Sequence, residues 1–244
     1  MNRIAFSIGE PSGIGPEVVL KSLNSEPLLE RCTPVIYAAP EFVLQQAKAF
    51  GVDTDLIHVS TDIYDLVKGQ INVLDVWNDT SGIPSGKPSP ESGLKAFQSL
   101  EKAFSDVRLG KMKALITAPI DKKNIQQKGF PFPGHTEYLA AGTDTADYLM
   151  LLVSGALRVG VVTGHIPLKS VADALNTADI LKKVKVLHES LKNDFGITNP
   201  KIALLGLNPH AGDGGLLGEE EQTVIQPAID QANALGINAF GPFP

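Results

Sequence analysis

Short apolar segments alternate with amphipathic segments along most of the chain. The apolar segments are rich in β-branched and aliphatic residues, which is typical of buried strands. They span residues 4–8, 34–38, 71–76, 114–117, 149–153, 157–162, 202–207 and 237–240. Helical periodicity predicts helices over residues 41–50, 91–107, 177–195 and 219–235. This alternation predicts an α/β fold with a largely parallel sheet that is covered on both faces.

The third of these helices has the clearest boundaries. Its apolar stripe consists of Ile180, Val184, Leu187 and Leu191. Thr177 is a candidate N-cap residue, because its hydroxyl can accept a hydrogen bond from a free backbone N–H of the first turn. Gly196 is placed to end the helix, since glycine adopts the left-handed conformation without a steric penalty.

Two segments depart from the simple alternation. Ser154, Gly155 and Ala156 separate two apolar segments by a short turn, which predicts a β-hairpin and therefore a mixed sheet. Residues 79–92 contain Gly82, Gly86 and three prolines and follow neither periodicity. We expect a long loop there, either a linker or a flap.

Composition and charge exclude several classes of protein. The chain has 244 residues, of which 43% are hydrophobic and 20% charged, as in ordinary globular domains. Its net charge of -6, with the basic residues scattered, argues against nucleic-acid binding. Cys32 is the single cysteine, and no segment is long and apolar enough for a signal peptide or a membrane span. We therefore expect a cytoplasmic protein with no membrane partner.

Three histidines share the same kind of position. His135, His165 and His210 each lie in a short polar or glycine-rich loop after an apolar segment. The first irregular residues beyond a buried strand are where side chains from several strands can converge. These loops indicate a site for a metal ion or an anion.

His165 and His210 are the candidate metal ligands. His210 lies with Asp213 among four glycines, where an imidazole has little core to fill. Neutral imidazoles suit zinc and other divalent transition ions, but a catalytic zinc site normally has three protein ligands. The third ligand could be His135, Asp213, or a side chain from a partner subunit or from a segment beyond Pro244.

His135 and Thr136 form a second candidate site near an expected helix start. An imidazole and a hydroxyl together can hydrogen-bond a substrate phosphate or carboxylate, although Thr136 could equally be a helix cap. Lys122 and Lys123 could add positive charge, but adjacent lysines at a helix start are more often solvated. We interpret His58 and His188 as structural residues without a functional role.

The loop at residues 9–17, with sequence GEPSGIGPE, joins the first strand to an expected helix with Pro16 near its start. Its backbone N–H groups could bind an anion, or the loop could be no more than a tight turn. Glu10 and Glu17 weaken the case for a phosphate site. Because no segment fits G-x-G-x-x-G, the sequence gives no support for a Rossmann-type dinucleotide site.

Five motifs together resemble the 4-hydroxythreonine-4-phosphate dehydrogenase family, PdxA. They are GEPSGIGPE at residues 9–17, TAPIDK at 117–122, PGHTEYLA at 133–140, TGHIPL at 163–168 and NPHAGDGG at 208–215. The resemblance runs in order over nearly the whole chain. It departs mildly at Glu10, Ser12, Gly164 and Asp213, where Asp, Ala, Thr and Glu are common, and none of these changes removes an imidazole.

The resemblance implies the NAD-dependent oxidation and decarboxylation of 4-phosphooxy-L-threonine to 3-amino-2-oxopropyl phosphate, in pyridoxal phosphate biosynthesis. It implies that His165 and His210 bind a divalent metal, with zinc favoured over cobalt, magnesium or manganese, and that His135 and Thr136 contact the substrate. The implied fold resembles isocitrate and isopropylmalate dehydrogenases, with two lobes, in a homodimer whose active sites lie at the subunit interface. The sequence identifies neither a general base nor the residues that contact NAD.

The sequence leaves two questions open, namely how much of the catalytic unit the chain contains and which substrate it uses. We expect residues 1–244 to form a single catalytic unit of two interleaved lobes that is incomplete at the C-terminus, because family members continue to a third metal-binding histidine. Related enzymes act on 4-phospho-threonate or 4-phospho-erythronate. A metal-dependent hydrolase, a phosphate acyltransferase and an inactive binding chain are alternatives from other classes.

Overall fold

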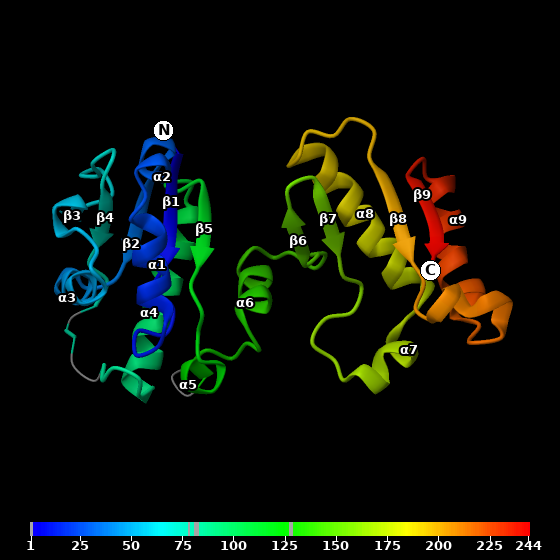
Figure 1. The fold of residues 1–244 in the computed structure, drawn as a ribbon, viewed down its shortest axis with the longest axis horizontal. Coiled ribbons are helices and arrows are strands. Elements are labelled where there is room, and N and C mark those ends of the chain that lie inside the picture. Colours follow the sequence, from blue (N-terminus) through cyan, green and yellow to red (C-terminus); the bar gives the residue numbers. More distant parts are fainter. Residues whose placement is uncertain (1, 78, 81–82, 127–128) are drawn as a thin grey trace. The chain divides into compact units, whose positions relative to one another are not determined.

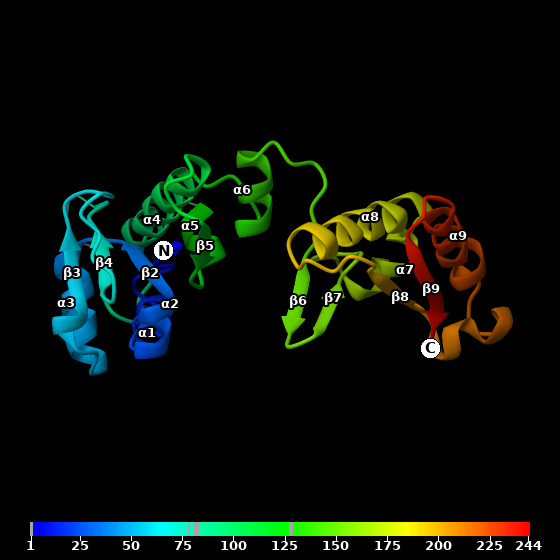
Figure 2. The same cartoon turned by 90° about the horizontal axis from the view of Figure 1, so that it is seen from above.

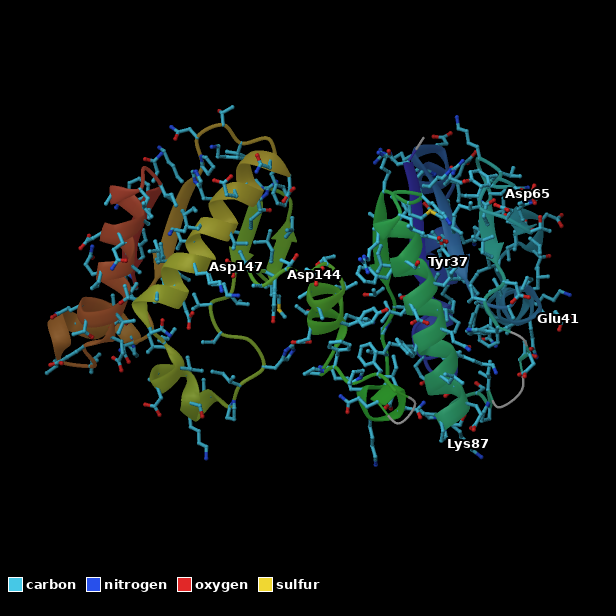
Figure 3. The ribbon with its side chains drawn as sticks, turned by 180° about the vertical axis from the view of Figure 1, so that it is seen from behind. Tyr37, Glu41, Asp65, Lys87, Asp144 and Asp147 are labelled. Atoms are coloured by element: carbon cyan, nitrogen blue, oxygen red, sulfur yellow. The ribbon has the colours of Figure 1, made fainter. Side chains whose placement is uncertain are left out.

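The computed structural model describes residues 2–77, 79–80, 83–126 and 129–244. The chain divides into two units, Met1–Asp144 and Thr145–Pro244. Figure 3 labels Asp144, the last residue of the first unit, and Asp147 near the start of the second. No helix in the described part of the chain is both long and apolar enough to cross a membrane.

A five-stranded parallel sheet is the centre of the first unit, with strand order β3-β4-β2-β1-β5 (Figure 1). The strands are β1 (Asn2–Ser7), β2 (Cys32–Tyr37), β3 (Ile57–Ser60), β4 (Ile71–Leu74) and β5 (Ala114–Thr117). The helices are α1 (Gly15–Leu23), α2 (Glu26–Arg31), α3 (Pro40–Phe50), η1 (Thr54–Leu56), α4 (Pro90–Arg108), α5 (Lys122–Gln126) and α6 (His135–Gly142). The predicted α/β class with a largely parallel sheet is confirmed.

Alternate residues of the central strands pack on opposite faces of this sheet, as the two-residue period of a strand requires. Phe6 and Ile36 pack with residues of α1 and α3, whereas Ala5 and Val35 pack with Ala103 of α4. Figure 2 shows α4 on the other side of the sheet from α1. Helices therefore cover both faces, as the continuous apolar character of these strands predicts.

A buried hydrogen bond fixes α4 against the middle of the sheet. The Tyr37 hydroxyl donates to Asp106 Oδ2 at 3.0 Å, and Figure 3 shows Tyr37 beside α4. Lys102 and Lys111 pair with the other oxygen of this carboxylate, at 3.4 and 3.1 Å. The Asp106 charge is thus compensated by two ammonium groups, which makes its burial tolerable.

The second unit contains two short ladders and a helical layer. Its elements are β6 (Leu151–Ser154), β7 (Leu157–Gly160), η2 (Leu168–Ser170), α7 (Val171–Ala174), α8 (Thr177–Asn193), β8 (Lys201–Leu205), η3 (Pro209–Gly215), η4 (Glu221–Ile225, π-helical), α9 (Gln226–Ala234) and β9 (Asn238–Phe243). Strands β6 and β7 are antiparallel and β8 and β9 are parallel. The predicted hairpin at residues 154–156 is confirmed, but it forms a separate two-stranded sheet.

The predicted stripe of α8 faces the core of the second unit. Ile180, Val184 and Leu191 are buried against β8 and α9, and Leu187 is partly buried beside them. The expected N-cap, Thr177, is wrong by one residue. The N-cap is Asn176, whose side-chain oxygen accepts from the Asp179 N–H at 2.8 Å. Thr177 instead donates its hydroxyl to Val224 O at 3.0 Å, across to the π-helical turn.

Other boundaries differ by a few residues from the sequence prediction. Gly196 has the expected left-handed backbone, with φ of 67°, just beyond α8. The loop predicted over residues 79–92 ends at Ser89, because Ser89 and Ser92 form a reciprocal capping box at the start of α4. Ser81 and Gly82 of that loop lie outside the described residues.

Candidate functional site

The loops that follow β1 and β5 meet at the carboxyl end of the first sheet. Strand β1 pairs with β2 on one side and with β5 on the other, so the order of strands reverses there. Ligands of open α/β sheets bind outside the carboxyl ends of strands at such a reversal. Glu10 N donates to Pro119 O at 2.8 Å, and a Cβ on Gly9 would lie 2.3 Å from that same oxygen. Only glycine therefore allows these two loops to approach so closely.

The carboxylate of Glu10 folds back into its own loop. It is buried, it accepts from the Ser12 N–H at 3.1 Å, and it accepts from the Asn124 amide of α5 at 2.8 Å. The Asn124 amide also donates to Ser92 Oγ of α4 at 3.1 Å. An anion of the chain itself thus occupies part of the loop, which favours the tight-turn interpretation of residues 9–17 over a phosphate site.

His135 and Thr136 begin α6, as the sequence indicates, and Gly134 is its N-cap residue. The Nε2 atom of His135 is buried and has no hydrogen-bond partner among the described residues. Burial, and then the charge of Lys122, hold the pKa of His135 below its ordinary value. The ring is therefore neutral at neutral pH, with one nitrogen able to donate and the other able to accept.

Lys122 lies beside this histidine loop. A Cβ on Gly134 would be 3.9 Å from Lys122 Nζ and 3.5 Å from Glu137 Oε2. The sequence gives no reason to choose between Lys122 and Lys123 as a source of positive charge. The fold does, because the Lys122 ammonium lies near Gly134 and its charge acts on His135. A neutral imidazole with a free nitrogen, a hydroxyl and an ammonium in neighbouring positions can bind an anionic group.

Aromatic packing holds α6 in place behind this loop. The ring of Tyr138 lies 5.3–6.1 Å, between centroids, from four other rings. These rings belong to Phe97, Phe104, Phe130 and Phe132. Two of these contacts, with Phe97 and Phe132, are edge-to-face, and such directional packing fixes the start of α6, where His135 lies.

In the second unit, His165 and His210 lie in loops at the ends of β7 and β8, which are consecutive strands of the chain but belong to separate sheets. His165 follows β7 and His210 follows β8, and both residues are exposed. Figure 1 shows β7 and β8 pointing the same way, so that both loops leave from the same end of the unit. Thr163 after β7 and Leu207 after β8 line one apolar cavity of about 700 Å³.

The His210 loop has an unusual backbone. Five consecutive residues from His210 to Gly214 have positive φ, between 45° and 78°. Three of them, His210, Ala211 and Asp213, are not glycine, and for such residues this conformation costs about 1–2 kcal/mol each. Contacts elsewhere must therefore hold the loop in this form.

Glu221 provides such contacts. Acidic residues at the start of a helix commonly complement its dipole from an exposed position, but Glu221 is 2% exposed. One oxygen accepts from the Leu207 and Asn208 N–H groups at 2.7 Å each, and the other accepts from the Asn208 amide at 3.1 Å. Burial raises the pKa of this carboxyl, but the hydrogen bonds outweigh it and hold the pKa below its usual value.

The imidazoles of His165 and His210 could supply two of the ligands that a metal ion needs. Both rings are exposed, and neither has a hydrogen bond to any residue that the structure describes, so their nitrogens are free to coordinate. Within the described ranges, however, no group of three or more His, Cys, Asp or Glu side chains is gathered that could hold a metal ion. The chain thus offers two candidate ligands without a complete set, and Asp213 is not shown to join them.

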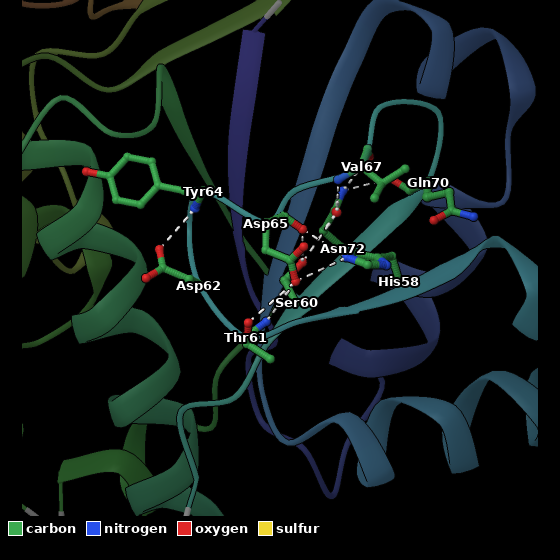
Figure 4. Close-up of polar contacts among 9 residues, drawn as sticks. All are labelled: His58, Ser60, Thr61, Asp62, Tyr64, Asp65, Val67, Gln70 and Asn72. Atoms are coloured by element: carbon green, nitrogen blue, oxygen red, sulfur yellow. Dashed lines mark hydrogen bonds and ion pairs between the residues drawn. The ribbon is translucent and has the colours of Figure 1, made fainter.

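The two remaining histidines, to which we assign no role from the sequence, lie in different surroundings. His58 Nε2 donates to Asp65 O at 2.8 Å, within a polar cluster that closes the loop between β3 and β4 (Figure 4). Asn72 belongs to the same cluster and donates to Val67 O at 3.0 Å. His188 lies on α8, and its Nδ1 is buried.

Comparison with known proteins assigns the chain to a family. Residues 30–244 match the family described as "Pyridoxal phosphate biosynthetic protein PdxA". A 4-hydroxythreonine-4-phosphate dehydrogenase of Bacteroides thetaiotaomicron is 40% identical over 99% of this chain and 66% of its own length. An Oceanobacillus iheyensis protein provisionally named D-threonate 4-phosphate dehydrogenase is 38% identical over 99% of this chain and 73% of its own length.

A solved structure has the same fold. The crystal structure of 4-hydroxythreonine-4-phosphate dehydrogenase from Klebsiella pneumoniae superposes with a TM-score of 0.90 at 32% identity. The superposition covers 100% of this chain and 75% of that one. The chain thus spans from about two thirds to three quarters of the length of these proteins, and the predicted family is confirmed.

Proposed function

Because the chain belongs to the PdxA family of pyridoxal phosphate biosynthetic proteins, we propose that it acts in the NAD-dependent oxidation and decarboxylation of 4-phosphooxy-L-threonine. The product would be 3-amino-2-oxopropyl phosphate. The observation that carries the proposal is the family match over residues 30–244, which includes four of the five motif loops. The names of its relatives agree, since they are called dehydrogenases of this substrate.

The loop at the start of α6 would bind the anionic part of the substrate. His135 would donate a hydrogen bond from its neutral ring, and the Thr136 hydroxyl would add a second. Lys122 would supply positive charge beside them, which an acidic chain needs in order to attract an anion. Holding the substrate through such contacts orients its hydroxyl for hydride transfer.

His165 and His210 would be two metal ligands. A divalent ion, with zinc the first candidate, lowers the pKa of a coordinated alcohol and stabilises negative charge that develops on its oxygen. Both loops leave from the same end of the second unit, and the first residues of each, Thr163 and Leu207, line the same cavity, which supports a common role. A third ligand would come from a partner subunit or from a segment beyond residue 244, and we propose a cytoplasmic homodimer on the resemblance alone.

A second substrate has specific support. The Oceanobacillus iheyensis relative is nearly as similar to this chain as the Bacteroides one, at 38% against 40% identity, yet is named for D-threonate 4-phosphate. The two substrates differ in the group on one carbon, an amine or a hydroxyl. The phosphate contacts proposed for His135 and Thr136 serve both equally.

A substrate panel with metal analysis tests the proposal. The chain would be loaded with Zn²⁺, and NADH formation followed at 340 nm with 4-phosphooxy-L-threonine, D-threonate 4-phosphate and D-erythronate 4-phosphate. We expect NADH only with substrate present, and a loss of both bound zinc and turnover in His165→Ala and His210→Ala. His188→Ala is the matched control from the same unit and should keep both.

Each outcome is decisive for one part of the proposal. Turnover of the threonate alone would replace the proposed substrate by the second one. Release of phosphate or an acyl group without NADH would indicate a hydrolase or acyltransferase. Full zinc occupancy in both histidine variants, with circular dichroism unchanged, would refute the metal site.

A further inference from the structure

The loop that carries His210 is wrapped around the carboxylate of Glu221. A Cβ on Gly206, before the loop, would lie 3.1 Å from Glu221 Oε1. A Cβ on Gly212, after His210, would lie 2.7 Å from Glu221 Oε2. Glycine at both positions therefore lets the backbone close on the carboxylate from two sides.

Hydrogen bonds fix the same carboxylate from a third direction. The Leu207 and Asn208 N–H groups converge on one oxygen at 2.7 Å, and the Asn208 amide donates to the other at 3.1 Å. His210 thus stands between two anchored points, Asn208 two residues before it and Gly212 two residues after it. Its own φ of 57° is held by these contacts and not by local preference.

We propose that Glu221 is a positioning residue that fixes the His210 loop, and with it the direction in which the His210 imidazole meets a divalent cation. This inference rests on the proposed function, since it takes His210 as a ligand. Glu221 does not itself coordinate the ion, because three N–H donors already engage its oxygens and its side chain is closed off from solvent.

The charge and the shape of the side chain are both required. In Glu221→Gln the amide oxygen can still accept from Leu207 and Asn208, but the amide NH₂ then faces the NH₂ of Asn208. The hydrogen bond between these two side chains is then lost, and Asn208 Nδ2 keeps only its bond to Glu220 Oε2, at 2.7 Å. Glu221→Ala removes every contact and leaves the Leu207 and Asn208 N–H groups without a partner.

Zinc affinity, measured by competition with a chromophoric chelator, is the first test. Groups that orient a metal-binding histidine typically change metal affinity by about 10- to 100-fold. We expect at least a tenfold loss of Zn²⁺ affinity in Glu221→Gln and a larger loss in Glu221→Ala. The matched control is Glu219→Gln, which removes the same charge two residues away from an exposed side chain with no side-chain hydrogen bond to a described residue.

Amide hydrogen exchange separates this inference from the proposed function. We expect faster exchange over residues 206–218 in Glu221→Gln, with unchanged exchange in α8 and in the Glu219→Gln control. Faster loop exchange with zinc affinity within twofold of the original would make Glu221 a structural residue only, and unchanged exchange would overturn the inference directly. If the unsubstituted chain and His210→Ala bind zinc equally, the metal role of His210 fails, and the exchange data alone decide whether Glu221 anchors the loop.

Discussion

Lys122 and Lys123 are adjacent in sequence and both exposed, but only Lys122 perturbs His135. Its ammonium lies beside the Gly134 position, and its charge is the second cause, after burial, that lowers the pKa of the imidazole. A positive charge close to an imidazole disfavours protonation, and burial has the same effect. The neutral form of His135 is therefore favoured by two features of the fold, its burial and the nearby charge of Lys122.

Lys122→Gln should raise the pKa of His135 toward its ordinary value of about 6.5 without reaching it, because burial remains. Since the folded pKa lies below that of the unfolded chain, the neutral ring stabilises the fold fully above pH 6.5 or so, and this contribution is lost as the pH falls. An NMR titration of the His135 Cε1–H signal measures the shift. Lys123→Gln is the control, and an equal shift in both variants would contradict the assignment to Lys122.

Among single residues, the functional histidines could be predicted from the sequence, whereas the role of Glu221 could not. The histidine loops could be found from their composition, since glycine-rich segments after strands are exposed. The role of Glu221 could not, because Glu219, Glu220 and Glu221 are identical in type and consecutive. The Asn208 amide donates to both Glu220 and Glu221, and only the convergence of the Leu207 and Asn208 backbone N–H groups on Glu221 distinguishes that residue.

Elements with strong periodicity were predictable, whereas short ones were not. The strand at Ala114–Thr117 was predicted with its observed bounds, and α3, α4 and α8 within about two residues of theirs. The sequence does not predict strand β3, because Ile57–Ser60 includes a histidine and a serine. Their hydrogen bonds, to Asp65 of the following loop and to Asn72 of β4, form only in the fold. The π-helical turn before α9 also gives no sequence signal, since the same residues continue a helical pattern.

The N-terminus of α8 provides a prediction at this scale. Asn176→Ala removes the acceptor for the Asp179 N–H and should lower the free energy of unfolding by about 0.5–2 kcal/mol. Asn193→Ala, the same substitution at the other end of the helix, is the control and should have little effect. Urea denaturation followed by circular dichroism at 222 nm measures both, and equal effects of the two substitutions would show that Asn176 is not a functional cap.

At the scale of the whole molecule, each unit has its own hydrophobic core. The three buried clusters of the first unit contain only residues before Asp144, and the cluster of the second contains only residues after Thr145. Two lobes were expected from the family resemblance, and their boundary could not be read from the sequence. The reason is that residues 143–150 contain neither proline nor glycine, the residues that most clearly mark a linker.

Separate cores predict separate responses to a cavity. Leu100 on α4 and Ile229 on α9 are both buried, at 0% and 3% exposure, and replacing either by alanine should cost about 2–5 kcal/mol in its own unit. Local opening is governed by local stability, so Leu100→Ala should speed amide exchange in the central sheet, and Ile229→Ala should do so in α8, α9 and β8. Hydrogen exchange read by mass spectrometry resolves these segments. Equal acceleration in both units by either substitution would mean that the two cores unfold as one cooperative structure, and the division at residue 144 would then have no energetic meaning.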